Sequence, residues 1–338
     1  AALFSGIGEP LRIAERLKPQ AGAGELVIKV DACGICASDL HAAEAQGMVG
    51  PDNVFGHEYA GEVVAIGPGV DGNWQIGDRL ISLPVRPCGL CAACQAGRYT
   101  QCSDLAIQGF DPRMPGAYAE YTTCLAALAM KIPATLDSKD AALIEPLAVG
   151  LGAARAGAIP PGASVLVIGA GIIGLATAKW ARFLGAGEVG ISERVPARLE
   201  RARQAGADFV IDAAAAADPV AEYQRVTGRM PSVIFECVGR PLIKSLIEVA
   251  PHGAHLVMVG TCMQPEEITV VAAAMKRLRM SFTLAYEAED FGFVLRMLGC
   301  GRIDSAGLVT ATVDLDNLPA MFATLQKPND HCKVLITP

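Results

Sequence analysis

Short apolar runs alternate with stretches of helical periodicity between about residues 160 and 286. The apolar runs fall at 165–168, 188–192, 209–211, 233–236, 255–259 and 282–285. Runs of this length bounded by turn residues are typical of buried strands, and strands that alternate with helices form parallel sheets. The pattern therefore predicts an α/β region with a doubly wound parallel sheet of six strands.

The chain before this region shows a different pattern of apolar and polar residues. Apolar runs at 26–30, 61–66 and 79–83 are separated by Gly, Pro and Asp, which are turn residues. This pattern predicts a β-rich barrel or irregular sheet.

The chain after residue 286 adds little that resembles a further parallel strand. It shows one helical stretch near 291–298 and a strand at 333–337. We therefore assign this tail to the β-rich part. The expected domains are a β-rich domain at 1–150 with 287–338, and an α/β domain at 151–286.

Composition agrees with two folded domains and excludes several classes of partner. Of the 338 residues, 52% are apolar and 19% are charged, which argues against disorder. The net charge of −7, without a block of one sign, argues against a nucleic-acid partner. The longest apolar stretch, 164–178, is broken by glycines and is shorter than the roughly 20 residues of a bilayer span. No membrane segment or secretory signal is recognised, so a cytoplasmic protein is expected.

A glycine-rich turn stands directly after the first apolar run of the α/β region. It reads Gly169-Ala170-Gly171-Ile172-Ile173-Gly174 and opens an apolar helix. Glycines there allow a tight turn, and the free N–H groups of the helix start favour a pyrophosphate. A glycine-rich turn without a nucleotide is the alternative, and it ranks lower because the strand, the helix and a downstream carboxylate are all in place.

That carboxylate is Glu193, which follows the last glycine by 19 residues and ends the next apolar run. A carboxylate at this place accepts hydrogen bonds from the ribose and repels a 2′-phosphate, which favours NAD over NADP. Arg194 and Arg198 could accommodate that phosphate, so NADP remains open. Val238, Gly239 and Gly260 end two later runs, where contact with the nicotinamide or a plain turn is expected.

Eleven cysteines in such a chain indicate metal ligation rather than a disulfide framework. Four of them stand within 15 residues, at Cys88, Cys91, Cys94 and Cys102. Four thiolates at short spacings in a loop suit a closed tetrahedral zinc site of structural type. Disulfides are the less favoured alternative. The expected zinc lobe covers about 86–104.

A second set of candidate zinc ligands is dispersed along the chain. It contains Cys36, the pair His57 and Glu58, and Glu145. One thiolate, one imidazole and one or two carboxylates suit a zinc ion that keeps a position open for substrate. Spacing does not prove that they converge, because His57–Glu58 could be an ordinary turn and Cys36 a small core residue.

The run Gly56-His57-Glu58-Tyr59-Ala60-Gly61, continued to Gly67 and Val70, resembles the zinc signature of the medium-chain zinc-dependent alcohol dehydrogenases. The cysteine lobe, the glycine-rich turn and the order of the elements agree over essentially the whole chain. Glu145 in Ile-Glu-Pro-Leu is similar to the sorbitol, threonine and butanediol dehydrogenase branch. The resemblance implies a GroES-like catalytic domain, a Rossmann domain and two zinc ions per chain.

The resemblance also implies roles for individual residues. Cys36, His57 and Glu58 match zinc ligands, and Glu145 matches either a fourth ligand or a partner of the zinc-bound water. Ser38 and His41 match a proton relay, with a turn hydroxyl and a surface histidine as the plain alternatives. Family members are oxidoreductases of the NAD(P)-dependent alcohol dehydrogenase type, so an enzyme that assembles as a homo-dimer or homo-tetramer is expected.

The substrate is the least determined part of the prediction. Sorbitol-type enzymes hold their polyol with an Arg-Tyr pair, and the comparable stretch here, 284–287, reads Leu-Ala-Tyr-Glu. Losing that arginine would leave hydroxyls unpaired at about 1 to 3 kcal/mol each. A secondary alcohol, cyclic alcohol or vicinal diol oxidised to the ketone is therefore preferred. The alternatives are a sorbitol-like polyol or threonine, or a catalytically silent relative of the family.

Overall fold

The computed structural model describes residues 1–338, which form two compact units. Unit 1 contains Ala1–Glu145, Glu287–Ser305 and Val309–Pro338, and unit 2 contains Pro146–Tyr286 and Ala306–Leu308. Helix α4 (Ile144–Ala156) carries the chain from the first into the second. The sequence places this boundary after residue 150, because the pattern does not mark a change inside a continuous helix.

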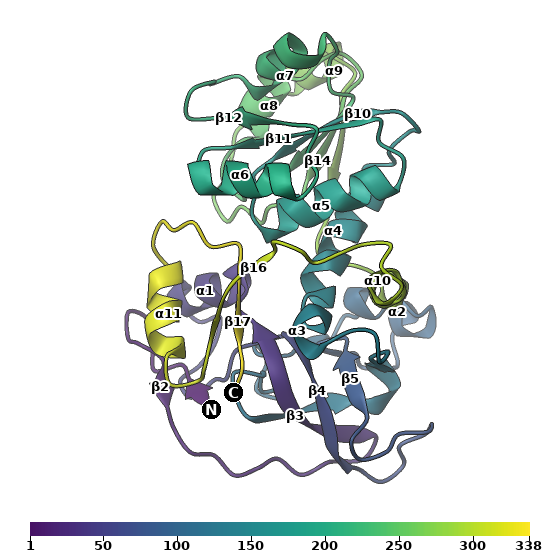
Figure 1. Cartoon of the computed structure of the whole chain (residues 1–338), viewed down its shortest axis with the longest axis vertical. Coiled ribbons are helices and arrows are strands. Elements are labelled where there is room, and N and C mark those ends of the chain that lie inside the picture. The colour runs from purple at the N-terminus through teal and green to yellow at the C-terminus, as the bar shows by residue number, and fades with distance from the viewer. The chain divides into compact units, whose positions relative to one another are not determined.

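Unit 2 is built on a sheet of six parallel strands in the order β12-β11-β10-β13-β14-β15 (Figure 1). In chain order they are β10 (Ser164–Ile168), β11 (Glu188–Glu193), β12 (Phe209–Asp212), β13 (Val233–Glu236), β14 (His255–Met258) and β15 (Arg279–Phe282). The chain reverses its direction across the sheet between β10 and β13, so the carboxyl ends of these two strands border the place where such sheets bind ligands. The predicted Rossmann fold is confirmed.

Helices cover both faces of this sheet (Figure 1). They are α5 (Ile172–Phe183), α6 (Pro196–Gln204), α7 (Pro219–Thr227), α8 (Ile243–Val249) and α9 (Val270–Met275). Leu166 and Ile168 of β10 pack in one buried cluster with α7 and α8. Val167, which points the other way, lies 3.5 Å from the Cβ position of Gly174 in α5. Alternate residues of one strand thus serve two helical layers, which explains the continuous apolar run.

The sequence-based placement of the last strand, at 282–285, is wrong. The strand β15 is Arg279–Phe282, and it is one of the two edge strands of the sheet, with Arg279 and Phe282 exposed. Edge strands are buried on fewer sides and need no apolar run. The residues that follow leave the sheet, and Ala285 adopts a φ of 59°.

Unit 1 is the β-rich body that the sequence predicts, and it matches the GroES-like description. Its seven-stranded sheet follows the order β16-β17-β3-β4-β5-β9, with β8 paired to β3. The strands are β3 (Glu25–Gly34), β4 (Glu58–Ile66), β5 (Arg79–Ser82), β8 (Tyr121–Leu125), β9 (Ala129–Lys131), β16 (Val309–Val313) and β17 (Lys333–Ile336). Two small sheets pair β1 (Ala2–Leu3) with β2 (Arg12–Ile13), and β6 (Val85–Arg86) with β7 (Ala106–Ile107).

Short helices fill the connections of unit 1. They are α1 (Ala37–Glu44), α2 (Ala92–Gln95), α3 (Ser138–Ala141), α10 (Ala288–Gly299), α11 (Leu318–Leu325) and the 3₁₀ turns Tyr99–Gln101 and Ala126–Leu128. None of the helices in either unit combines the length and the apolar character that crossing a bilayer requires.

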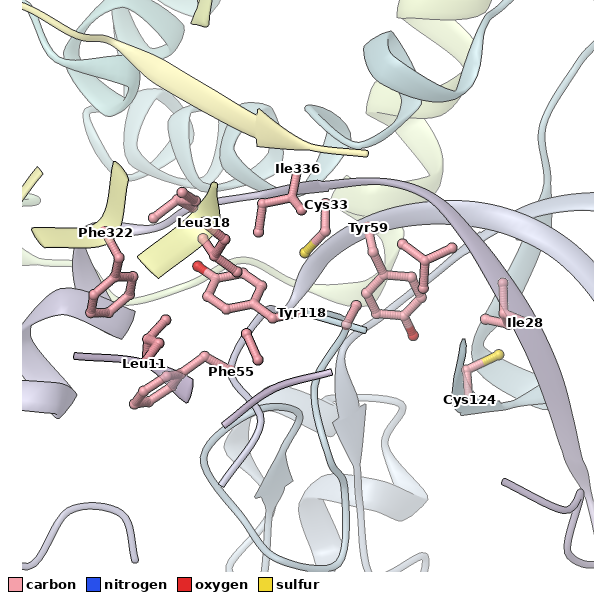
Figure 2. Close-up of a cluster of buried hydrophobic side chains, with 14 of the residues drawn as sticks. Leu11, Ile28, Cys33, Phe55, Tyr59, Tyr118, Cys124, Leu318, Phe322 and Ile336 are labelled. Carbon is pink, nitrogen blue, oxygen red and sulfur yellow. The ribbon is translucent and has the colours of Figure 1, made fainter. Parts of the chain in front are cut away.

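The tail completes the sheet and the core of unit 1. Strand β17 pairs antiparallel with β3, and β16 pairs parallel with β17. Figure 2 shows Leu318 and Phe322 of α11 beside Phe55 and Tyr118, and the rings of Phe55 and Phe322 stack with centroids 6.0 Å apart. The sequence predicts α10 and β17 but misses α11 and β16, because both are short and only partly buried and thus lack a clear period.

Candidate functional site

Three of the dispersed ligand candidates converge in unit 1. The sulfur of Cys36, a ring nitrogen of His57 and a carboxylate oxygen of Glu58 all lie within 4.8 Å of one another. Cys36 is the N-cap of α1, Glu58 is the first residue of β4, and His57 immediately precedes that strand. The antiparallel register pairs Gly34 of β3 with Glu58, so the pairing of two strands brings the ligand segments together. We call these three residues the mixed ligand set.

A buried carboxylate orients the histidine of this set. Asp39 Oδ1 lies 3.3 Å from His57 Nδ1, and Asp39 is completely buried. Its Oδ2 accepts hydrogen bonds from the Tyr118 hydroxyl at 2.7 Å and the Cys36 backbone N–H at 3.1 Å. With Nδ1 directed at Asp39, the Nε2 atom of His57 is left for a metal.

In the metal-free protein, Asp39 and His57 each stabilise the charged form of the other. Burial alone would raise the pKa of Asp39, but His57 and the hydrogen bonds outweigh it and lower that pKa. Burial likewise would lower the pKa of His57, and Asp39 outweighs it and raises that pKa well above its usual value. Asp39 and Tyr118 were not predicted as residues of the site, because no local pattern in the sequence shows that they meet His57.

A buried lysine meets the glutamate of the set. Lys333 Nζ lies 2.7 and 2.6 Å from the two carboxylate oxygens of Glu58, and it donates to the Ile35 carbonyl at 2.8 Å. Both side chains are 1% exposed. Burial would lower the pKa of Lys333, but the charge of Glu58 outweighs burial and raises it. Lys333 was not predicted from the sequence, because it is 275 positions from its partner.

The remaining predicted residues of the open site lie nearby or on α1. Glu145 is in the first turn of α4 and is outside the mixed ligand set, although its charge contributes to the raised pKa of Lys333. Ser38 is half-buried and His41 is exposed, and both are on α1. The relay through these two side chains stays a prediction.

The four cysteines of the predicted lobe also converge, with all four sulfurs within 4.8 Å of one another. The sulfurs of Cys91 and Cys94 are 3.5 Å apart and those of Cys88 and Cys94 are 3.9 Å apart. Ligands at about 2.3 Å in a tetrahedron stand roughly 3.8 Å apart, so the set fits zinc. Hydrogen bonds from the backbone of Cys94 and Ser103 lower the pKa of Cys91 to about 6, which favours the thiolate.

The glycine-rich turn has the predicted context in unit 2. Gly169 follows β10 with a φ of 100°, and Gly171 is the N-cap of α5. A Cβ on Gly174 would lie 1.9 Å from the Gly169 carbonyl oxygen, so this glycine is required by packing. A Cβ on Gly171 would meet nothing within 4 Å, and no side chain caps the helix. The start of α5 is therefore open to an anionic ligand.

Glu193 ends β11 and reaches the glycine-rich turn. Its Oε2 accepts a hydrogen bond from the Ala170 N–H at 2.9 Å, and its Oε1 accepts from the N–H groups of Arg194 and Val195 at 2.6 and 3.0 Å. The carboxylate therefore holds the two loops together at the place where a ribose is expected. The side chain of Arg194 is exposed, and that of Arg198 is half-buried.

The loops after β13 and β14 lie against each other. The N–H groups of Val238 and Gly239 donate to the buried Glu236 at 2.6 and 2.9 Å. A Cβ on Gly260 would lie 2.1 Å from the Gly239 nitrogen. Close backbone approach thus accounts for the glycine at 260, while contact of Val238, Gly239 and Gly260 with a nicotinamide stays a prediction. Glu236, which holds the loop after β13 through these two N–H groups, was not predicted from the sequence.

Comparison with known proteins identifies the family. Residues 22–134 match the alcohol dehydrogenase GroES-like domain, and residues 173–299 match the zinc-binding dehydrogenase family. The chain is 33% identical to a sorbitol dehydrogenase of Bacillus subtilis over 95% of its own length and 92% of the relative. The chain belongs to the medium-chain zinc-dependent alcohol dehydrogenases. The predicted enzyme class, a zinc-type dehydrogenase that uses a nicotinamide cofactor, is thereby confirmed.

Solved structures of this dehydrogenase family agree over the whole chain. A zinc-binding dehydrogenase from Sinorhizobium meliloti bound to NADP matches with a TM-score of 0.90 and 29% identity, covering 100% of this chain and 98% of that one. An alcohol dehydrogenase from Escherichia coli in complex with NADH matches with a TM-score of 0.89 and 30% identity, over 100% and 98% of the two chains. Relatives of equal similarity thus bind different cofactors.

We predict that a chelator removes the two zinc ions of this dehydrogenase at different rates. The mixed ligand set has one thiolate and an open position, whereas the cysteine lobe is closed by four thiolates, so the first ion should leave roughly tenfold faster or more. Timed chelation with zinc analysis, activity and circular dichroism measures this. Activity should disappear with the first zinc while the structure remains.

The matched variant changes the lobe. Cys91→Ser should lower solubility or assembly, as expected when a structural site is lost. Simultaneous loss of both ions in the wild type, or loss of structure before activity, would contradict the assignment of the two sites.

Proposed function

We propose that this dehydrogenase oxidises a secondary alcohol, a cyclic alcohol or a vicinal diol to the ketone, with NAD as the hydride acceptor. The observation that carries the proposal is the mixed ligand set, which leaves a zinc ion one position for a substrate oxygen. The stretch at 284–287 supports a less polar substrate. Leu284 is 82% exposed and Tyr286 is buried, and no arginine follows β15 in this stretch.

When bound, zinc supplies Lewis acidity toward the substrate hydroxyl, and the nicotinamide accepts the hydride. The chain's own residues position the reactants and move the proton. Asp39 keeps the His57 ring in the orientation that presents Nε2. Ser38 would accept the hydroxyl proton and pass it toward His41, which lies one turn further along α1, is exposed, and would release it to solvent. Glu145 either completes the ligand set or holds a water beside it.

A screen combined with metal analysis tests this function. Two zinc ions per chain and NAD reduction with secondary alcohols, cyclic alcohols or vicinal diols are expected. Turnover of sorbitol or threonine in preference to these would favour the polyol or threonine alternative. Two bound zinc ions without turnover of any of these alcohols would favour a silent relative of the family.

We predict that Ser38→Ala lowers turnover by roughly 10²-fold or more, because the substrate proton loses its acceptor. His41→Ala should lower turnover less, since water can replace an exposed relay member. Steady-state kinetics with zinc content as the control measures both. Near-normal turnover of Ser38→Ala with zinc retained would exclude the relay.

The preference for NAD rests on Glu193. A 2′-phosphate would approach a carboxylate in a partly desolvated place, which should favour NAD by roughly 10- to 100-fold in kcat/KM. Arg194, whose side chain is exposed, could turn toward that phosphate and weaken the preference. The two cofactors bound by the related structures show that both outcomes occur among relatives of this dehydrogenase.

We predict that Glu193→Ala relaxes the preference toward NADP. The variant should also bind NAD less well, because the Ala170 N–H loses the acceptor that holds the glycine-rich turn. The measurement is kcat/KM with both cofactors for the wild type and the variant. Zinc content should be unchanged. A wild-type enzyme that already prefers NADP would show that Arg194 and Arg198, rather than Glu193, determine the cofactor preference.

We further propose that the enzyme assembles as a homo-dimer or homo-tetramer through the β15 edge of unit 2. The outer backbone groups of this edge strand have no neighbouring strand, and an antiparallel copy of the same strand can pair with them about a two-fold axis. Large apolar side chains are exposed along the same segment: Met263, Val270, Val271, Met275, Phe282 and Leu284. Such a patch is typical of a protein interface.

Phe282→Glu should therefore shift the protein toward the monomer in analytical ultracentrifugation, because it places a charge in the apolar patch. Leu17→Glu is the matched control, since Leu17 of unit 1 is 97% exposed and stands outside this segment. An unchanged sedimentation profile for Phe282→Glu would exclude this interface.

We propose the cytoplasm as the working compartment. Seven residues form the two candidate metal sites, and five of them are cysteines that must remain reduced thiolates to bind zinc. Reducing compartments keep thiols in that state. The partner expected there is a small alcohol or ketone.

A further inference from the structure

The carboxylate of Glu58 in unit 1 is placed to bind two cations, a zinc ion and the ammonium of Lys333. Glu58 belongs to the mixed ligand set, and both of its oxygens also lie within 2.7 Å of the Lys333 ammonium. The third donor of that ammonium binds the Ile35 carbonyl, so every N–H of the lysine is used inside the protein. Lys333 therefore holds Glu58 firmly from the side of β17.

The backbone provides a fitted place for this carboxylate. A Cβ on Gly34 would lie 2.0 Å from Glu58 Oε2, so the glycine leaves the space that the carboxylate occupies. Strand β17 pairs with β3 at Leu335 opposite Gly34, which places Lys333 close to the ligand segment that carries Cys36. Glu58 is thus held by a strand pairing, a glycine and a lysine before any metal is considered.

Electrostatics give the lysine two opposite effects. A fully buried carboxylate without a cation is strongly unfavourable, and Lys333 supplies that cation in the zinc-free protein. When zinc binds, two cations face one carboxylate, and each weakens the hold of the other. The same ion pair thus stabilises the zinc-free site and reduces the affinity of the site for zinc.

We infer that Lys333 is a positioning residue that competes with zinc for Glu58. It keeps the zinc-free site folded and makes Glu58 the ligand of the set that is most easily displaced. This inference rests on the proposed zinc site at Cys36, His57 and Glu58, and it assigns a role to a residue that does not bind the metal itself.

The test measures zinc affinity of the complete enzyme, with the cysteine lobe still loaded, by competition with a chromogenic chelator. Lys333→Met removes the charge and keeps the length of the side chain. It should bind the exchangeable zinc at least tenfold more tightly than the wild type, while its zinc-free form melts at a lower temperature. Lys333→Arg retains the cation and should remain close to the wild type in both measurements.

Two further variants give the controls. Lys131→Met removes a half-exposed lysine that pairs with Asp78 on the same sheet, and it should leave zinc affinity unchanged. In a Glu58→Gln background no carboxylate remains to be shared. There the effect of Lys333→Met on zinc affinity should shrink from tenfold to less than threefold.

The outcomes separate this inference from the proposed function. If Cys36→Ser does not lower the affinity for the exchangeable zinc ion, the proposed site itself is wrong. If Cys36→Ser does lower that affinity, and folded Lys333→Met binds zinc no more tightly than the wild type, the competition between Lys333 and zinc for Glu58 is excluded. Should Lys333→Met fold only with zinc, the double variant Lys333→Met/Glu58→Gln must regain a stable zinc-free form, and failure to do so would overturn the inference.

Discussion

The structure of unit 1 depends on compensating two carboxylates that are buried next to the zinc-ligand segments. Asp39 and Glu58 are at most 1% exposed, and a buried charge is tolerated only with partners. Asp39 obtains them from His57, the Tyr118 hydroxyl and the Cys36 backbone, and Glu58 from Lys333. The pairing of β17 with β3 meets this requirement for Glu58, because it brings Lys333 to the carboxylate.

The two candidate zinc sites differ in what they require of the fold. The cysteine lobe is assembled from four residues in one short stretch, so a loop with two helical turns is sufficient to form it. The mixed ligand set needs the register of β3 and β4, the start of α1 and the support of β17. This difference explains why the first set is recognisable from spacing alone, whereas convergence of the second could be expected only from a family resemblance.

The sequence predicted the parts of the fold whose signal is local. Five of the six strands of unit 2 are close to their predicted positions, and four of these are interior strands, whose burial on two faces gives an apolar run. The edge strand β15 was misplaced and β16 was missed, since strands that are only partly buried carry no continuous apolar run. Asp39, Tyr118, Glu236 and Lys333 act through contacts that the chain makes only after folding, and no spacing rule connects Lys333 with a glutamate 275 positions away.

The discontinuity of unit 1 has a consequence for how the enzyme is made. All six strands of unit 2 lie between residues 164 and 282, so its sheet can form while the chain is still being synthesised. The sheet of unit 1 lacks β16 and β17 until residue 336 has left the ribosome. During that interval the carboxylate of Glu58 lacks its cationic partner, Lys333. At this stage a nascent chain can hold a folded unit 2 while the carboxylate of Glu58 in unit 1 is still uncompensated, and this is the period when early zinc binding or a chaperone would matter most.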